Sequence, residues 1–452
     1  MSGWLGQIRS RLNAEYLLGA SPVATWLRGA GWLFASSLIE RAAALLQTIV
    51  IARMIGIESY GRYGLIFSTI GLMTPLVGLQ LPYAIVYFVS RFQTADPARA
   101  GAVVLLARRL TMATTVGAVI LSIPFYPQLS WWLFHTDGFG NAVILGAVIL
   151  LASVQIGLSD ALLQAREKFR TLATARLVVA VFSIALIAPV AWYTRSLIPV
   201  LTAVAIAALV RLVSVAIPAR RISREFTAQS DLRAALRQGA VILQFSLPSG
   251  LLALAQGVSA WIGTFYLART PEGLRDVAVL STGVQWRSPI LVVMASLASA
   301  LLPMLGRYLG EDNKAQTHRL QRYNMILNIG VALTFSIVTI LAGKWILAAY
   351  GRDFHGGWLL FSLFVIALVP AVYCNVHQQY LVATGQMWTQ FALFVPFTLI
   401  HVLGTLHYAA TLDGLTLGYI QLGGWVVTAA LISIVVAIDR RRDRLNAISG
   451  AA

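Results

Sequence analysis

Long apolar segments separated by short polar ones recur along the whole chain. A helix needs roughly 20 apolar residues to cross the hydrocarbon core of a bilayer, whereas strands of a membrane barrel alternate apolar and polar residues over about ten positions. The apolar runs here are long and continuous, so the pattern predicts transmembrane helices. We expect twelve, near residues 30–53, 63–89, 108–126, 140–164, 171–193, 197–218, 239–267, 277–303, 325–342, 358–382, 388–410 and 414–438.

The composition agrees with many spans and excludes other classes of protein. Of the 452 residues, 58% are hydrophobic and 11% are charged, whereas an ordinary soluble domain has about 25% charged residues. The single cysteine, Cys374, excludes a disulfide scaffold. The chain has no motif of a catalytic nucleophile, a phosphate-binding loop or a metal site. We therefore expect no enzymatic activity, no cofactor and no metal.

The net charge of +17 is distributed unevenly between the predicted loops. With the N-terminus in the cytoplasm, 23 of the 34 Lys and Arg residues fall in cytoplasmic segments and six in outside loops. This bias is typical of inner-membrane proteins, so we expect both termini in the cytoplasm, near anionic membrane lipids, and no nucleic-acid partner. Trp4, Ile8, Leu12 and Tyr16 recur every four residues. This spacing predicts an interfacial helix, with a frayed tail as the alternative.

The two halves of the chain repeat at an offset of about 216 residues. Arg53 matches Arg269 and Arg91 matches Arg307, and Trp132 matches Trp345 at a slightly shorter offset. Two basic loops on the same side require an even number of spans between them, so the halves are parallel repeats. We predict an all-α polytopic membrane protein with two six-helix lobes. Its expected parts are an N-terminal segment (1–28), an N-lobe (29–218), a cytoplasmic linker (219–238), a C-lobe (239–438) and a basic tail (439–452).

Charged residues inside predicted spans are the strongest candidates for function. Glu40 and Arg41 lie in the first span and Arg287 in the eighth; a charge at the centre of a bilayer costs about 2.5–3.5 kcal/mol. The guanidinium group binds phosphate oxygens bidentately, so Arg41 and Arg287 predict a cavity for a phosphate-bearing anion, with structural ion pairs as the alternative. Gln285 and Gln256, which lie on polar stripes of their spans, are further candidates for substrate binding.

The acidic residues of the spans have two interpretations. Glu40 and Asp160 could bind a coupling proton or sodium ion, or they could pair with arginines on other spans. Arg176 and Arg211 lie near the inner ends of their spans, where snorkelling explains them. We keep both as secondary cavity candidates together with His377, although a lone histidine in a span more often packs with a hydrogen bond.

Three segments resemble a known family of transporters. Residues 52–64 (ARMIGIESYGRYG), residues 350–354 (YGRDF) and the Leu163-x-Ala165…Phe169 pattern resemble polysaccharide repeat-unit flippases, the Wzx-like branch of the multidrug/oligosaccharidyl-lipid/polysaccharide exporter superfamily. The resemblance implies a twelve-helix, two-lobed, MATE-like transporter of the bacterial inner membrane. Such proteins move undecaprenyl-pyrophosphate-linked oligosaccharides for O-antigen or exopolysaccharide to the periplasmic leaflet, beside polysaccharide assembly proteins. A cationic cavity in this family agrees with Arg41 and Arg287.

Two other functions remain open from the sequence. The first is a cation-coupled drug antiporter of the same superfamily, for which Glu40 would be essential. The second is a membrane polysaccharide polymerase or glycosyltransferase, which usually has a large outer loop. The outside loops near 127–139 and 343–357 are short, which counts against this enzyme. The first span also lacks the arginine cluster expected of peptidoglycan-precursor flippases, which counts against lipid II as the substrate.

Overall fold

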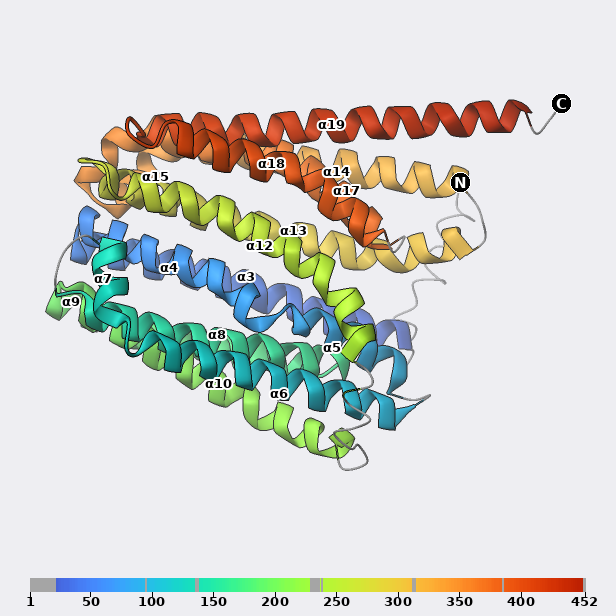
Figure 1. Cartoon of the computed structure of the whole chain (residues 1–452), viewed down its shortest axis with the longest axis horizontal. Helices are drawn as coiled ribbons and strands as arrows, with labels where there is room; N and C mark the ends of the chain where they lie inside the picture. Colours follow the sequence, from blue (N-terminus) through green and yellow to red (C-terminus); the bar gives the residue numbers. More distant parts are fainter. Residues whose placement is uncertain are drawn as a thin grey trace, which may run out of the picture.

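The computed structural model describes residues 22–93, 96–134, 138–227, 236, 239–310, 314–383 and 386–449. These residues form helices joined by short connections (Figure 1). The helices are α3 (Pro22–Ile55), α4 (Ile57–Gly78), α5 (Leu81–Phe92), α6 (Pro97–Ser122), α7 (Tyr126–Phe134), α8 (Gly140–Ala165), α9 (Phe169–Thr194), α10 (Leu197–Thr227), α12 (Gly239–Leu267), α13 (Gly273–Gly310), α14 (Lys314–Leu341), α15 (Gly343–Tyr350), the 3₁₀ helix η1 (Arg352–Gly357), α16 (Trp358–Ile366), α17 (Leu368–Ala383), α18 (Met387–His407) and α19 (Gly414–Ser449).

Each of the twelve predicted spans coincides with a helix or a consecutive helix pair. Ten described segments are long and apolar enough to cross a membrane, and α4 with α5 forms an eleventh span bent by 45°. The bend falls at Leu79 and Gln80, which both have φ of 50°, a left-handed conformation that interrupts a helix. The twelfth is α3, whose 34 residues extend about 51 Å at 1.5 Å per residue.

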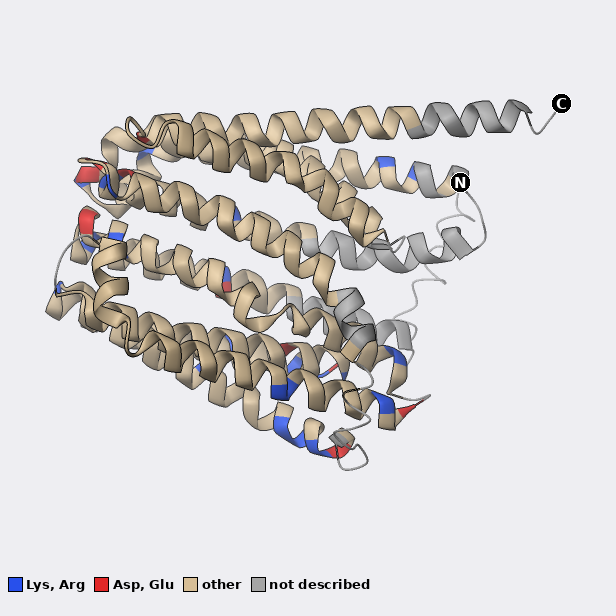
Figure 2. Cartoon of the chain, in the orientation of Figure 1, with Lys and Arg blue, Asp and Glu red and all other residues tan. Residues whose placement is uncertain are grey.

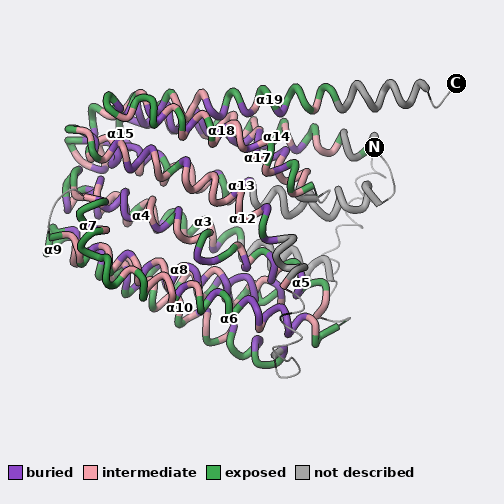
Figure 3. Tube along the Cα trace, viewed as in Figure 1, coloured by how far each residue is buried: buried purple, intermediate pink, exposed green. Residues whose placement is uncertain are grey.

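The helices form two groups that follow the repeat. Figure 1 shows α3–α10 on one side and α12–α19 on the other. The helix starts are related as the sequence predicts, since α4 begins at Ile57 and α13 begins 216 residues later at Gly273. Exposed apolar side chains such as Ile434 and Ile438 lie along α19, and exposed positions follow the outer sides of both groups (Figure 3). These sides are suited to lipid.

The expected boundaries between the parts differ in detail from the structure. Helix α10 continues to Thr227 and α19 to Ser449, so the first part of the expected linker and most of the expected tail are helical. The predicted N-terminal interfacial helix lies outside the described residues.

The charged residues gather at the two ends of the molecule, with few between them (Figure 2). We call the end at Ile55 the outer end and the opposite one the inner end, after the orientation that the charge bias predicts. At the outer end the two lobes share one apolar core, to which Ile51 and Tyr60 contribute from the N-lobe and Val277 and Phe361 from the C-lobe. The buried hydroxyls of Thr48 and Tyr350 lie 3.1 Å apart across this contact.

The lobes approach most closely at Gly61 of α4. A methyl group there would lie 2.0 Å from the backbone oxygen of Leu274 on α13, and backbone atoms cannot yield as a side chain can. We expect Gly61→Ala to force the lobes apart and destabilise the protein by about 1–3 kcal/mol, measured as a lower thermal unfolding midpoint in detergent.

Gly71 provides the matched control on the same helix. A methyl group at Gly71 meets nothing within 4 Å, and alanine favours a helix over glycine by up to about 1 kcal/mol. Gly71→Ala should therefore keep or slightly raise the midpoint. Equal midpoints for both variants would contradict the close approach of α4 and α13.

Candidate functional site

Four charged side chains meet inside the N-lobe and form what we call the charged ring: Glu40, Asp160, Arg176 and Arg211. Glu40 accepts a hydrogen bond of 2.5 Å from Nη1 of Arg211 and lies 3.7 Å from Nε of Arg176. Asp160 lies 3.5 Å from Nη2 of Arg211 and 3.6 Å from Nη2 of Arg176. Each carboxylate thus contacts both guanidinium groups, and the formal charges of the ring cancel.

Four different helices contribute to the ring. Helix α3 carries Glu40 and packs along α9, while α10 packs against both α8 and α9. Arg176 also donates a hydrogen bond of 2.8 Å to Ser37 on α3. The side chains of Arg176 and Arg211 are only 16% and 28% exposed. The snorkelling interpretation of these two arginines is therefore wrong, because they turn inward to reach carboxylates that are costly to leave unpaired.

The C-lobe has no charge at the positions that the repeat makes equivalent to the ring. Glu40 and Asp160 correspond to residues 216 and 218 positions later, and the two arginines to residues 218 and 217 positions later. These counterparts are Gln256, Gln378, Phe394 and Thr428. Phe394 and Thr428 are fully buried. The charged ring is thus a property of the N-lobe and not of the repeated fold.

Arg41 leaves α3 on the side that the C-lobe approaches. It lies seven residues, or two turns, before Thr48, so both side chains leave the same face of the helix, and Thr48 reaches Tyr350 of the C-lobe. Arg41 is exposed, and no carboxylate among the described side chains lies within ion-pair distance of it. Arg41 is therefore a charge at the boundary between the lobes.

The remaining candidates divide between two faces of the C-lobe helices. Gln285 lies four residues beyond Ser281, which packs against Gly64 of α4, so Gln285 is on the face toward the N-lobe. Arg287 lies four residues beyond Gly283, which packs against Phe364 of α16, and is therefore turned toward the helices of its own lobe. No described contact joins Arg41 to Arg287.

Two further candidates lie within the C-lobe. Gln256 lies seven residues before Gly263, which packs against His401 and Leu417, so it shares the face of α12 that meets α18 and α19. His377 is 9% exposed, and its ring lies 4.8 Å from that of Tyr373 in an edge-on arrangement. Both side chains therefore lie away from the charged ring.

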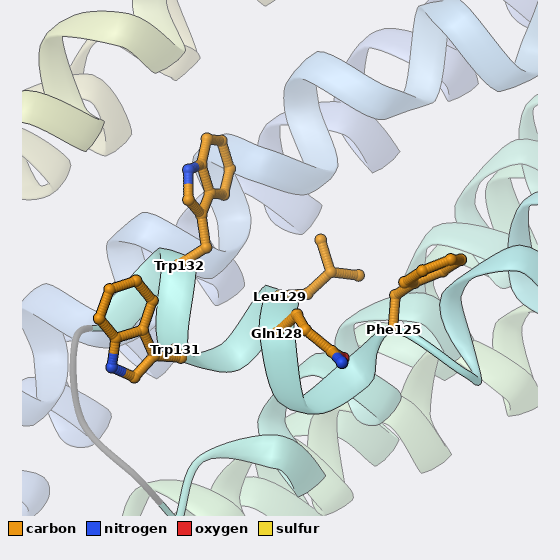
Figure 4. A pocket seen from close by; sticks show the side chains of 5 residues that line it. All are labelled: Phe125, Gln128, Leu129, Trp131 and Trp132. Atoms are coloured by element: carbon orange, nitrogen blue, oxygen red, sulfur yellow. The ribbon is translucent and has the colours of Figure 1, made fainter.

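An aromatic group at the outer end was not anticipated from the sequence. Trp132 of α7 stacks on Trp261 and contacts Phe265, both of α12. Trp132 also lines a surface pocket of about 490 Å³ with Phe125, Gln128, Leu129 and Trp131 (Figure 4). The only signal in the sequence was the match of Trp132 to Trp345, because the partner rings belong to a distant helix.

A sequence model of the polysaccharide biosynthesis protein family matches residues 26–309, more than half of the chain. The chain belongs to this family. A second model, MatE, matches residues 248–406. Two curated relatives share the name EPS I polysaccharide export inner membrane protein EpsE. The protein of Ralstonia nicotianae is 24% identical over 85% of this chain and 86% of its own length, and that of Ralstonia solanacearum is 23% identical with the same coverage.

Solved structures share the fold of this member of the polysaccharide biosynthesis protein family. An inward-facing multidrug resistance MATE transporter superposes with a TM-score of 0.70 at 18% identity, covering 94% of this chain and 99% of that one. The lipid II flippase MurJ in its inward closed conformation gives 0.68 at 12% identity, covering 90% and 87%. The predicted MATE-like, all-α polytopic fold is confirmed, and the protein is a multi-pass protein of the inner membrane.

The charged ring should be important for the stability of this polysaccharide biosynthesis family member. Asp160→Ala removes a buried carboxylate and leaves two arginines with one partner. Breaking a buried ion pair in this way costs about 3–5 kcal/mol, so we expect a clear fall in the thermal unfolding midpoint and in the folded yield.

Glu225→Ala is the control for this experiment. Glu225 is 65% exposed and lies 3.7 Å from Arg166, and an exposed pair contributes about 0–1 kcal/mol. The midpoint should hardly change. A midpoint for Asp160→Ala equal to that of Glu225→Ala would show that the ring does not stabilise the N-lobe.

Proposed function

We propose that the protein is a flippase for undecaprenyl-pyrophosphate-linked oligosaccharide repeat units. It moves them from the cytoplasmic to the periplasmic leaflet by alternating access between a lobe of residues 29–218 and a lobe of residues 239–438. Both termini lie in the cytoplasm. The polysaccharide cargo is supported by membership of the polysaccharide biosynthesis family and by relatives named for polysaccharide export.

The observation that carries the proposal is the position of Arg41. The repeat relates Arg41 to Gly257 and Leu72 to Ser288, both at an offset of 216. Gly257 packs tightly against Leu72, since a methyl group there would lie 3.3 Å from the Cα of Leu72. The equivalent place between α3 and α13 has Arg41 opposite Ser288. A large cation therefore stands where the other side of the interface is closed by glycine.

This side of the interface suits a diphosphate. Ser281, Gln285 and Ser288 form one stripe of α13 toward the N-lobe, and amides and hydroxyls bind phosphate and sugar oxygens without adding charge. Arg41 would hold the pyrophosphate bidentately, while Arg287 and Gln256 line the C-lobe side of the cavity. The lipid tail would stay in the bilayer. Coupling to H⁺ or Na⁺ would act at Glu40 or Asp160, whose neutralisation leaves the ring with excess positive charge.

Replacing the two candidate arginines tests the pyrophosphate site. We expect Arg41→Ala and Arg287→Ala to abolish restoration of surface polysaccharide in a bacterium that lacks its own translocase, because the diphosphate loses its counter-charge at the membrane midplane. Arg41→Lys should retain partial export, since lysine keeps the charge but not the planar fork.

The exposed Arg195 at the outer end of α9 serves as the control, and Arg195→Ala should export normally. Equal amounts of folded protein must be present in the membrane for all variants. Wild-type export by both Arg41→Ala and Arg287→Ala would refute the assignment. Efflux of cationic drugs that depends on Glu40 and not on Arg41 would favour the drug antiporter instead.

A disulfide between the lobes tests alternating access. A Cβ at Gly64 would lie 3.2 Å from the Cβ of Ser281, close to the roughly 3.5–4.5 Å of a disulfide. With Cys374 replaced by alanine, Gly64→Cys with Ser281→Cys should stop export when oxidised and restore it when reduced. Undiminished export by the oxidised, fully cross-linked protein would mean that the lobes do not separate at the outer end.

A further inference from the structure

Four side chains at the outer end connect α7 of the N-lobe to α12 of the C-lobe: Trp132, Trp261, Phe265 and Arg269. The ring of Trp132 lies 5.5 Å from that of Trp261 and 4.4 Å from that of Phe265. Trp261 and Phe265 stack at 4.6 Å. Rings at these separations attract each other beyond their apolar burial. One tryptophan of the N-lobe thus rests on a two-ring platform of the C-lobe.

Arg269 fastens this stack from above. Its guanidinium carbon lies 3.7 Å from the ring centre of Phe265 and 5.8 Å from that of Trp132, within the range of cation–π attraction. Nη2 of Arg269 donates a hydrogen bond of 2.8 Å to the backbone oxygen of Trp132. Desolvation by partial burial lowers the pKa of Arg269, but an arginine remains charged at neutral pH.

A second bond between the lobes lies directly below the rings. Nε1 of Trp261 donates a hydrogen bond of 3.1 Å to the hydroxyl of Thr69 on α4. The pocket beside Phe125 and Trp131 leaves space next to α7 on its other side (Figure 4). Helix α7 is therefore attached to the C-lobe through side chains that can separate without disturbing a membrane span.

The repeat shows that this arrangement is not a by-product of the fold. Trp345 of α15 is the counterpart of Trp132, and Arg53 is the counterpart of Arg269. Trp345 is 76% exposed, whereas Trp132 is 42% exposed. Among the described residues, α15 meets α3 through the hydroxyls of Tyr350 and Thr48. The aromatic stack therefore closes one side of the outer end and has no equivalent on the other.

We propose that Trp132, Trp261, Phe265 and Arg269 form an outer latch between the lobes, which must release before the substrate can leave toward the periplasm. The latch rests on the proposed alternating access of the flippase. Its contacts are aromatic and cation–π contacts at the end of the molecule, so α7 can leave α12 without exposing a charge to lipid. Weakening the latch shifts the protein toward an outward-open state.

Cysteine labelling in whole cells tests the latch without requiring a substrate. The reporter is Ser281→Cys in a background of Cys374→Ala, because Ser281 packs against Gly64 while the outer end is closed. A membrane-impermeant maleimide added from outside should reach it only when the lobes separate. Loss of an aromatic pair should raise the labelling rate about three- to tenfold, and we expect this for Trp132→Ala and for Arg269→Gln.

The repeat counterpart Trp345→Ala is the matched control and should label at the rate of the unaltered latch. If Trp132→Ala lowers the folded yield, Arg269→Gln and Arg269→Lys carry the test alone, since they leave the rings in place. Unchanged labelling in folded Arg269→Gln protein, or an equal rise in Trp345→Ala, would overturn the latch. Labelling that responds as expected in a protein that exports no polysaccharide would keep the latch and refute the flippase.

Discussion

A charge inside a membrane-spanning lobe has to be neutralised by another charge, and this constraint determines how the N-lobe is built. Glu40, Asp160, Arg176 and Arg211 come from four helices, and each carboxylate contacts both arginines. Removing any one leaves an uncompensated charge in a medium of low dielectric. The ring therefore fixes the rotation of four helices about their axes. The C-lobe has neutral residues at these positions and packs there through rings such as Phe397 and Trp425, which stack at 4.0 Å.

The ring also explains why Arg41 faces the other lobe. Consecutive residues of a helix point about 100° apart, so Glu40 and Arg41 cannot both turn into the N-lobe. Because Glu40 is held by Arg211 and Arg176, α3 has one rotation available, and that rotation directs Arg41 toward the seam with α13. The neutral ring and the free cation are thus two consequences of one helix orientation. An arginine fixed in this way loses little further freedom when it binds an anion.

The sequence was sufficient for the spans and the repeat, but not for which side chains meet. Hydrophobic runs and the offset of 216 residues are local or periodic signals, and the helices follow them. The partners of Glu40 could not be chosen, because Arg176 and Arg211 lie 136 and 171 residues away and only the packing of α9 and α10 brings them inward. The same reason conceals the contact of Trp132 with Trp261 and Phe265. Arg287 was expected to accompany Arg41, yet its helix face turns it toward α16, which no span assignment could show.

The different strengths of these contacts indicate which parts of the molecule move. Breaking the charged ring would cost about 3–5 kcal/mol for a single lost partner, so the N-lobe should move as one body. The contacts between the lobes are of another kind, because a cation–π contact at an exposed site contributes about 0.5–1 kcal/mol and an aromatic pair about 0.5–1.5 kcal/mol. A transporter needs contacts that hold one state and still release within a transport cycle. These weaker contacts lie between the lobes, at the outer end, whereas the strongest electrostatic contacts lie within the N-lobe. Motion should therefore occur at the boundary that Arg41 faces, so that the cation and the passage open together.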